Sequence, residues 1–195
     1  MTAGLLGSIH TPKQGNKLPA GAAWCADNGC FSTGYPGDDK WLAWLGTYTA
    51  EERSRCLFAT APDVVGDAAA TIARSAPWLP AIRALGYPAA FVAQDGLEDL
   101  DVPWDSFDVL FIGGSTEWKL GPAARVLVAQ AKARGKWIHM GRVNSALRLR
   151  YADAIGCDSA DGTFIAFGPD VNLPRMLANL RGVNDQMVLE MGRVA

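Results

Sequence analysis

Hydrophobic residues along the chain fall into short runs that alternate with stretches of helical spacing. The strand-like runs are four to six residues long and mostly apolar, at positions 5–10, 22–27, 56–61, 89–93, 108–112 and 137–140. Short apolar runs of this kind are typical of strands that are buried on both faces, as in a parallel sheet. The sequence therefore predicts at least six buried strands.

The stretches between these runs have the 3.6-residue period of helices. Trp41, Trp44, Leu45 and Tyr48 share one face of a predicted helix over 40–48, and a helix over 68–85 is expected to break near its two prolines. Further helices are predicted over 122–134 and 172–180. Strands that alternate with helices predict an α/β fold with a parallel sheet and right-handed crossovers. An open doubly wound sheet and a closed (β/α) barrel of the TIM type both fit, as a single domain over 1–195.

Residues 137–163 carry the most detailed pattern. A strand over 137–140 leads into a polar loop, and Asn144 or Ser145 can cap the helix that follows. Gly156 suits the C-terminus of that helix. We expect a last strand after it, continued by 163–167, with Asp158 and Asp161 at its far end. Chemistry in α/β folds gathers at the carboxyl ends of strands.

Composition narrows the class of protein. The formal net charge is −2, so attraction to nucleic acid would need a local basic patch, for which the sequence offers Lys132, Arg134, Lys136, Arg142, Arg148 and Arg150. No apolar run approaches a membrane span, and the first residues do not resemble a signal peptide, so we expect a cytoplasmic protein without a membrane partner.

The four cysteines form no Cys-x-x-Cys pair and only two histidines accompany them, which does not favour a zinc site. His139 lies inside an apolar strand and is predicted to be a hydrogen-bonded core residue.

Polar residues follow five of the predicted strands. They are Asp27-Asn28-Gly29, Asp63 with Asp67, Gln94-Asp95-Gly96, Gly113-Gly114-Ser115, and Asp158 with Asp161. If the strands are parallel, these clusters share one rim. Carboxylates and an amide can pair with ring N–H groups and amines, and glycines let a backbone approach a ligand, so the rim suits a polar planar ligand. The alternative is that Asp and Gly simply end strands and begin turns.

Five segments, in order, resemble motifs of the tRNA-guanine transglycosylase family, and most closely its phage relatives that insert deazapurines into DNA. The matching segments here are Asp27-Asn-Gly-Cys-Phe31-Ser, Ala93-Gln94-Asp-Gly96, Ile112-Gly-Gly-Ser-Thr-Glu-Trp118, Met140-Gly-Arg-Val143 and Gly156-Cys-Asp-Ser-Ala-Asp161-Gly. The resemblance spans residues 22–165.

The resemblance implies a (β/α) barrel and a role for each residue. Asp161 would be the nucleophile at the ribose C1′, and Asp27 the acid/base that handles the proton of the leaving and arriving base. The remaining residues would hold the base: Asn28, Asp67 (with Asp63 as the second choice), Gln94, Gly113, Gly114, Ser115 and Met140. The implied substrates are DNA, favoured over tRNA, and a 7-deazaguanine such as preQ0, with no cofactor and with a helper protein left open.

The chain departs from the family in several ways. Nothing supplies the family's zinc subdomain, and the short length predicts a trimmed barrel. Asn28 and Cys30 stand where the family has Ser and Gly, and the segment between Asp63 and Asp67 is shorter. Two other functions remain open: a module that binds a deazapurine or nucleotide without chemistry, and an N-glycosidase acting on small nucleosides.

Overall fold

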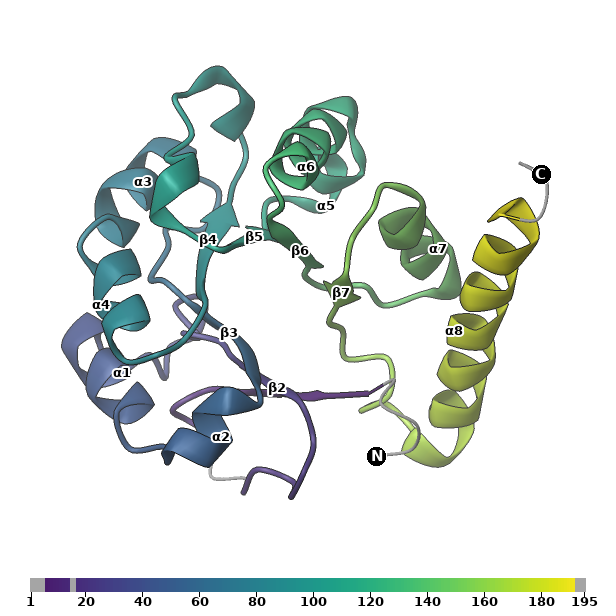
Figure 1. Ribbon diagram of the computed structural model, residues 1–195, viewed down its shortest axis with the longest axis horizontal. Coiled ribbons are helices and arrows are strands. Elements are labelled where there is room, and N and C mark those ends of the chain that lie inside the picture. The colour runs from purple at the N-terminus through teal and green to yellow at the C-terminus, as the bar shows by residue number, and fades with distance from the viewer. Residues whose placement is uncertain (1–5, 15–16, 192–195) are drawn as a thin grey trace.

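A computed structural model describes residues 6–14 and 17–191, with side chains described up to residue 181. In this part of the chain, seven parallel strands form one sheet in the order of the sequence. The strands are β1 (Ser8–His10), β2 (Trp24–Ala26), β3 (Cys56–Thr60), β4 (Ala89–Ala93), β5 (Val109–Ile112), β6 (Trp137–Met140) and β7 (Ser159–Ala160). The sheet curls strongly, and its helices lie outside the curve (Figure 1).

The sheet is a half-barrel and not the closed barrel that the resemblance implies. Within the described residues, β1 pairs with β2 and β7 pairs with β6, and no ladder joins β1 to β7. Both end strands are short, three and two residues, so little backbone is available for a closing ladder. Closure also requires a consistent stagger around the whole ring. The prediction of a parallel α/β sheet is confirmed.

The outer layer consists of helices at the predicted places and of two short ones that were not predicted. The long helix over 68–85 does break at its prolines, into α3 and α4, whereas α2 and α5 were missed because each is only five residues long. Residues 163–167 form turns and not a strand. The helices are α1 (Asp38–Leu45), α2 (Ala50–Ser54), α3 (Ala68–Ser75), α4 (Trp78–Ala84), α5 (Thr116–Leu120), α6 (Pro122–Ala133), α7 (Ala146–Ala154) and α8 (Pro169–Met191), with 3₁₀ turns η2 (Leu97–Asp99) and η3 (Trp104–Ser106).

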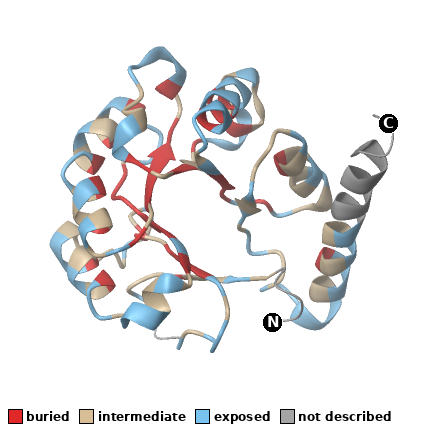
Figure 2. Cartoon of the chain, in the orientation of Figure 1, coloured by how far each residue is buried: buried red, intermediate tan, exposed pale blue. Residues whose placement is uncertain are grey.

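Side chains of the strands alternate between two apolar layers. The larger layer packs the convex face of the sheet against the helices and includes Trp24, Phe91 and Leu110. The smaller layer contains strand residues alone, among them Phe58 and Val109, and therefore fills the concave face. Figure 2 shows the central strands mostly buried, whereas the helices are buried only on their inner sides. Burial on both faces explains why the strands read as continuous apolar runs.

Candidate functional site

Parallel strands deliver the predicted polar residues to one rim of the half-barrel. Asp27 directly follows β2, Gln94 follows β4, Gly113 follows β5, and Asp161 follows β7. Asp63 lies three residues beyond the end of β3. Asp158 is the exception: it precedes β7, so it lies at the opposite rim, where it forms an ion pair of 2.8 Å with Lys132. The prediction that Asp158 accompanies Asp161 was wrong because β7 runs between the two residues.

The Asp161 carboxylate is held on both of its oxygens. His139 Nε2 lies 3.0 Å from Oδ2, and the backbone N–H of Arg142 donates to Oδ1 at 3.0 Å. Burial raises the pKa of Asp161, but the His139 hydrogen bond, the Arg142 N–H and the Lys119 charge outweigh burial, so the pKa lies below its usual value. Asp161 is therefore ionised, oriented and still 28% exposed.

Asp27 has the opposite electrostatics. Burial is the main reason that the pKa of Asp27 rises from 3.8 to about 6, and the negative charges of Asp161 and Asp63 raise it further. The hydrogen bond that Gly29 N–H donates to Asp27 Oδ1, at 3.2 Å, offsets part of this rise. Asp27 and Asp161 thus interact across the rim, and the first holds a proton far more readily than the second.

A second carboxylate centre joins the ends of β2, β3 and β4. Asp63 accepts hydrogen bonds from Asn28 Nδ2 at 3.1 Å and from Gln94 Nε2 at 2.8 Å, and all three side chains are buried. Burial raises the pKa of Asp63 despite these donors. Asn28 also donates to the Ala61 carbonyl, so both of its N–H groups are used. Gln94 keeps one amide N–H without a protein partner among these bonds, and Asp63 keeps spare lone pairs.

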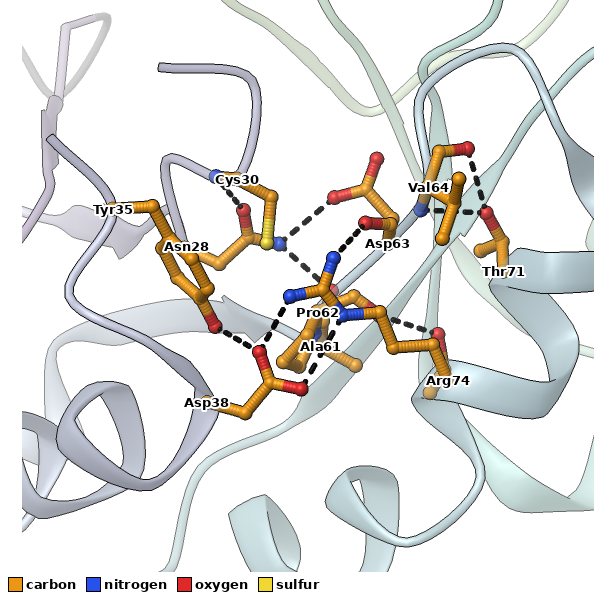
Figure 3. A network of polar contacts seen from close by, with 11 residues as sticks. Asn28, Cys30, Tyr35, Asp38, Ala61, Pro62, Asp63, Val64, Thr71 and Arg74 are labelled. Atoms are coloured by element: carbon orange, nitrogen blue, oxygen red, sulfur yellow. Dashed lines mark hydrogen bonds and ion pairs between the residues drawn. The ribbon is translucent and has the colours of Figure 1, made fainter. Parts of the chain in front are cut away.

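The loop after β2 is fixed onto this centre by an ion-pair network (Figure 3). Arg74 forms two hydrogen bonds to Asp38, the shorter at 2.6 Å, and a third to the Asp63 carbonyl at 2.8 Å. Tyr35 donates to the same Asp38 carboxylate at 2.6 Å. Since Arg74 lies on α3 and Asp38 begins α1, the network ties two helices and the loop to the end of β3. The residues around Asp27 and Asn28 are thereby held in place.

The two glycines after β5 serve packing more than ligand approach. A Cβ on Gly113 would lie 2.5 Å from Val92 Cγ1, and one on Gly114 would lie 2.3 Å from the Trp118 ring. Both backbone N–H groups donate to the Ala93 carbonyl, and Arg142 donates to both carbonyls. The backbone of this turn is thus fully occupied by the fold. Arg142 adopts a left-handed φ of 59° to make these contacts.

Three other residues predicted to bind the base instead have roles in the fold itself. Asp67 is exposed and caps α3 by accepting from Ala70 N–H, and Ser115 caps α5 by accepting from Trp118 N–H. Met140 is buried at the end of β6. The geometry therefore gathers Asp63 with Asn28 and Gln94, and leaves Asp67 outside this group. Both capping residues match the Asp/Ser preference at helix starts, which competes with any ligand-binding interpretation of such residues.

Lys119 is a functional candidate that the sequence interpretation missed. Its side chain is 1% exposed, and its ammonium donates to the Gly141 carbonyl at 2.6 Å. Burial, with the charges of Arg142 and Arg148, lowers its pKa to about 8, while Asp161 acts in the opposite sense. No sequence pattern predicts that this lysine is buried, because α5 is too short to show a helical period and lysines are ordinarily exposed.

A cavity of about 490 Å³ lies away from these carboxylates, at the amino ends of the strands. Cys56, Val109 and Trp137, which begin β3, β5 and β6, line it together with Lys132 and Lys136. The interacting carboxylates therefore favour the carboxyl rim as the chemical site, although the cavity lies at the opposite rim. The predicted basic edge is also divided, because Lys132 and Lys136 lie at one rim and Arg142 at the other.

Within the described residues, no group of three or more His, Cys, Asp or Glu side chains is placed to hold a metal ion. The same part of the chain contains no helix of sufficient length and apolarity to cross a bilayer. No model of a known protein family matches the chain. A search of curated proteins finds no relative either.

Proposed function

We propose that the protein exchanges a base in a polynucleotide, replacing guanine with a 7-deazaguanine through a covalent intermediate on Asp161. The observation that carries this proposal is the pair of carboxylates at one rim with opposite pKa shifts, Asp161 lowered and Asp27 raised to about 6. Two acids whose environments separate their pKa values are suited to the roles of nucleophile and proton donor. The resemblance of the rim motifs to transglycosylases assigns the same two roles.

The reaction would proceed in two balanced steps. A carboxylate oxygen of Asp161 attacks the ribose C1′, the C1′–N9 bond of guanine breaks, and Asp27 gives its proton to the leaving base. The incoming deazaguanine then loses its N9 proton to Asp27 and attacks C1′, which breaks the bond to Asp161 and restores both side chains. Dividing one difficult displacement into two is the advantage of a carboxylate nucleophile on a sugar. A base within a duplex would first have to be flipped out.

Recognition of the base is assigned to Asp63 and Gln94. Their contacts with each other leave lone pairs on Asp63 and one N–H on Gln94 for a ligand. The donor and acceptor edge of a guanine-like ring complements such a set. Asp67, the preferred residue by motif alone, is less suited because its carboxylate caps α3 at the surface. DNA is favoured as the polymer by the resemblance.

The test supplies labelled guanine or preQ0 together with single-stranded DNA, duplex DNA or tRNA. We expect incorporation into polymer, trapping of a protein-linked nucleic acid, and loss of both by roughly three orders of magnitude or more in Asp161→Asn. Asp27→Asn should lower exchange by about 10²- to 10⁴-fold, the usual contribution of a general acid.

Asp67→Asn is the matched control, because Asn caps a helix as well as Asp does and the side chain is exposed. This variant should retain exchange, whereas Asp63→Asn should lose it. Release of free base from small nucleosides, without polymer, would replace the proposal by an N-glycosidase. Ligand-induced stabilisation that survives Asp161→Asn, with no turnover of any substrate, would indicate a binding module.

A further inference from the structure

A line of hydrogen bonds runs along the concave face of β6 and β7 and ends on Asp161. Trp137 Nε1 donates to Ser159 Oγ at 3.0 Å, and Ser159 Oγ lies 2.8 Å from His139 Nδ1. His139 Nε2 then contacts Asp161 Oδ2 at 3.0 Å. Residues two apart along a strand share a face, so Trp137 and His139 of β6 lie on the same side. Ser159 of β7 is paired with His139, and Asp161, two residues further on, directly follows β7.

The direction of this line follows from counting donors. An indole N–H only donates, so Ser159 Oγ must accept from Trp137. The single hydroxyl hydrogen of Ser159 is then free to point at His139 Nδ1. A neutral imidazole that accepts at Nδ1 carries its hydrogen on Nε2, which is the nitrogen that faces Asp161. The ionised Asp161 carboxylate can only accept, so a hydrogen on Nε2 also satisfies the far end of the line.

We propose that His139 is a positioning residue for Asp161, and that Trp137 and Ser159 hold it in the Nε2–H tautomer. This inference rests on the proposed role of Asp161 as nucleophile. His139 would fix the attacking oxygen through one directed hydrogen bond, and the Arg142 N–H would fix the other oxygen. The line is not a path for protons, because the indole at its far end cannot pass one on.

The aromatic surroundings of His139 support a fixed ring. Phe58 and Phe111 pack against the imidazole with ring centroids 4.9 and 4.6 Å away, and His139 is 2% exposed. A ring packed in this way cannot turn over without disturbing the concave layer. The sequence interpretation of His139 as a hydrogen-bonded core residue is confirmed, and the structure adds that one of its partners is the candidate nucleophile.

Nitrogen NMR of the imidazoles tests the tautomer without any activity. The chain has only two histidines, His10 and His139, so a His10→Gln variant assigns both rings. We expect a protonated Nε2 and a bare Nδ1 on His139 in the wild-type protein. Ser159→Ala and Trp137→Phe should both let a hydrogen appear on Nδ1, since the donor to Nδ1 is removed or released. Ser54→Ala, an exposed serine that bonds a carbonyl in α2, should leave the spectrum unchanged.

Kinetics test the positioning role. We expect Trp137→Phe and Ser159→Ala to lower kcat for base exchange about ten-fold, the scale typical of lost orienting partners, with KM for the polymer unchanged. His139→Gln, whose amide N–H can still reach Asp161, should retain about ten-fold more activity than His139→Leu.

The outcomes distinguish a failure of the His139 inference from a failure of the proposed base exchange. A wild-type His139 in the Nδ1–H or doubly protonated form would overturn the tautomer assignment. A bare Nδ1 that persists in both Trp137→Phe and Ser159→Ala would overturn the role of Trp137 and Ser159 in holding it. Equal activity in His139→Gln and His139→Leu would overturn the positioning role. The predicted tautomer in a protein that exchanges no base would retain the tautomer assignment and reject the proposed function. Thermal unfolding of each variant identifies any that fails to fold. The wild-type imidazole spectrum then still tests the tautomer, and activity of His139→Gln no lower than that of the wild type would still overturn the positioning role.

Discussion

At the residue scale, Asp27 shows how a candidate site opposes stability. Its carboxyl binds a proton more tightly in the folded chain, where its pKa is about 6, than in the unfolded chain, where the ordinary value of 3.8 applies. A raised carboxyl pKa contributes stability that is complete below about pH 4 and lost as pH rises through 6. Residues kept for chemistry commonly destabilise the fold in this way.

We therefore predict that Asp27→Asn changes the pH dependence of stability. Relative to the wild type, the variant should gain about 2–3 kcal/mol in unfolding free energy between pH 4 and pH 7.5, because Asn carries no charge to bury. Urea unfolding of both proteins across this range measures the difference. Asp67→Asn, at an exposed cap, should follow the wild-type curve. Parallel curves for the Asp27→Asn variant and the wild type would show that the pKa of Asp27 is not raised.

The same residues show what the sequence could and could not predict. The position of Asp27, Gln94 and Asp161 at the carboxyl ends of strands was predictable, because each ends or directly follows a predicted strand. The choice between Asp63 and Asp67 could not be made, because it depends on whether the side chain turns toward Asn28 or toward the start of α3. Lys119 was missed because burial of a lysine is decided by tertiary packing, which leaves no local pattern.

At the scale of elements, the turn between β5 and α5 is defined by close packing. Glycines 113 and 114 leave room for Val92 and for the Trp118 ring, and Asp95 bonds both the N–H and the hydroxyl of Ser115. The sequence predicted a polar turn here, and we interpreted its glycines as letting the backbone approach a ligand. The structural reason for Gly-Gly is the absence of space for a Cβ, and a five-residue helix after it brings Lys119 inward.

Gly113→Ala should destabilise the protein by about 1–3 kcal/mol, the usual cost of overpacking, because its Cβ would overlap Val92 Cγ1. Val92→Ala alone should also destabilise by leaving a small cavity. The double variant should cost clearly less than the sum of the two, since each change relieves the other. Denaturant unfolding of the four proteins completes the cycle. Additive losses would mean that Val92 does not limit the space at Gly113.

At the scale of the whole molecule, strand number and direction were predictable, and closure was not. Each strand is encoded locally by an apolar run, and each crossover by a helix between runs, so a parallel α/β sheet follows from the sequence. Whether β1 and β7 meet depends on stagger and on strand length at both ends, which no local pattern sets. The division of the basic residues between two rims is likewise a property of the assembled fold.

That division leads to a prediction about polymer binding. With a net charge of −2, attraction to a polynucleotide must come from cations near the carboxyl rim. Arg142 lies at this rim, but its guanidinium is bound to the carbonyls of Gly113 and Gly114. Arg148, whose charge also acts on buried Lys119, is therefore the best placed to contact a phosphate. Arg150, two residues further along α7, lies about 200° around the helix and faces away. Lys132 and Lys136 line the cavity at the opposite rim.

Arg148→Ala should weaken binding of single-stranded DNA and reduce the slope of log K against log salt by about 1, as expected for one lost phosphate contact. Arg150→Ala on the same helix, and Lys132→Ala at the other rim, should leave the slope unchanged, and all three variants remove one positive charge. Fluorescence anisotropy at several salt concentrations measures the slopes. If Lys132→Ala lowers the slope and Arg148→Ala does not, the polymer binds at the amino ends of the strands, and the carboxylates of the opposite rim cannot act on it.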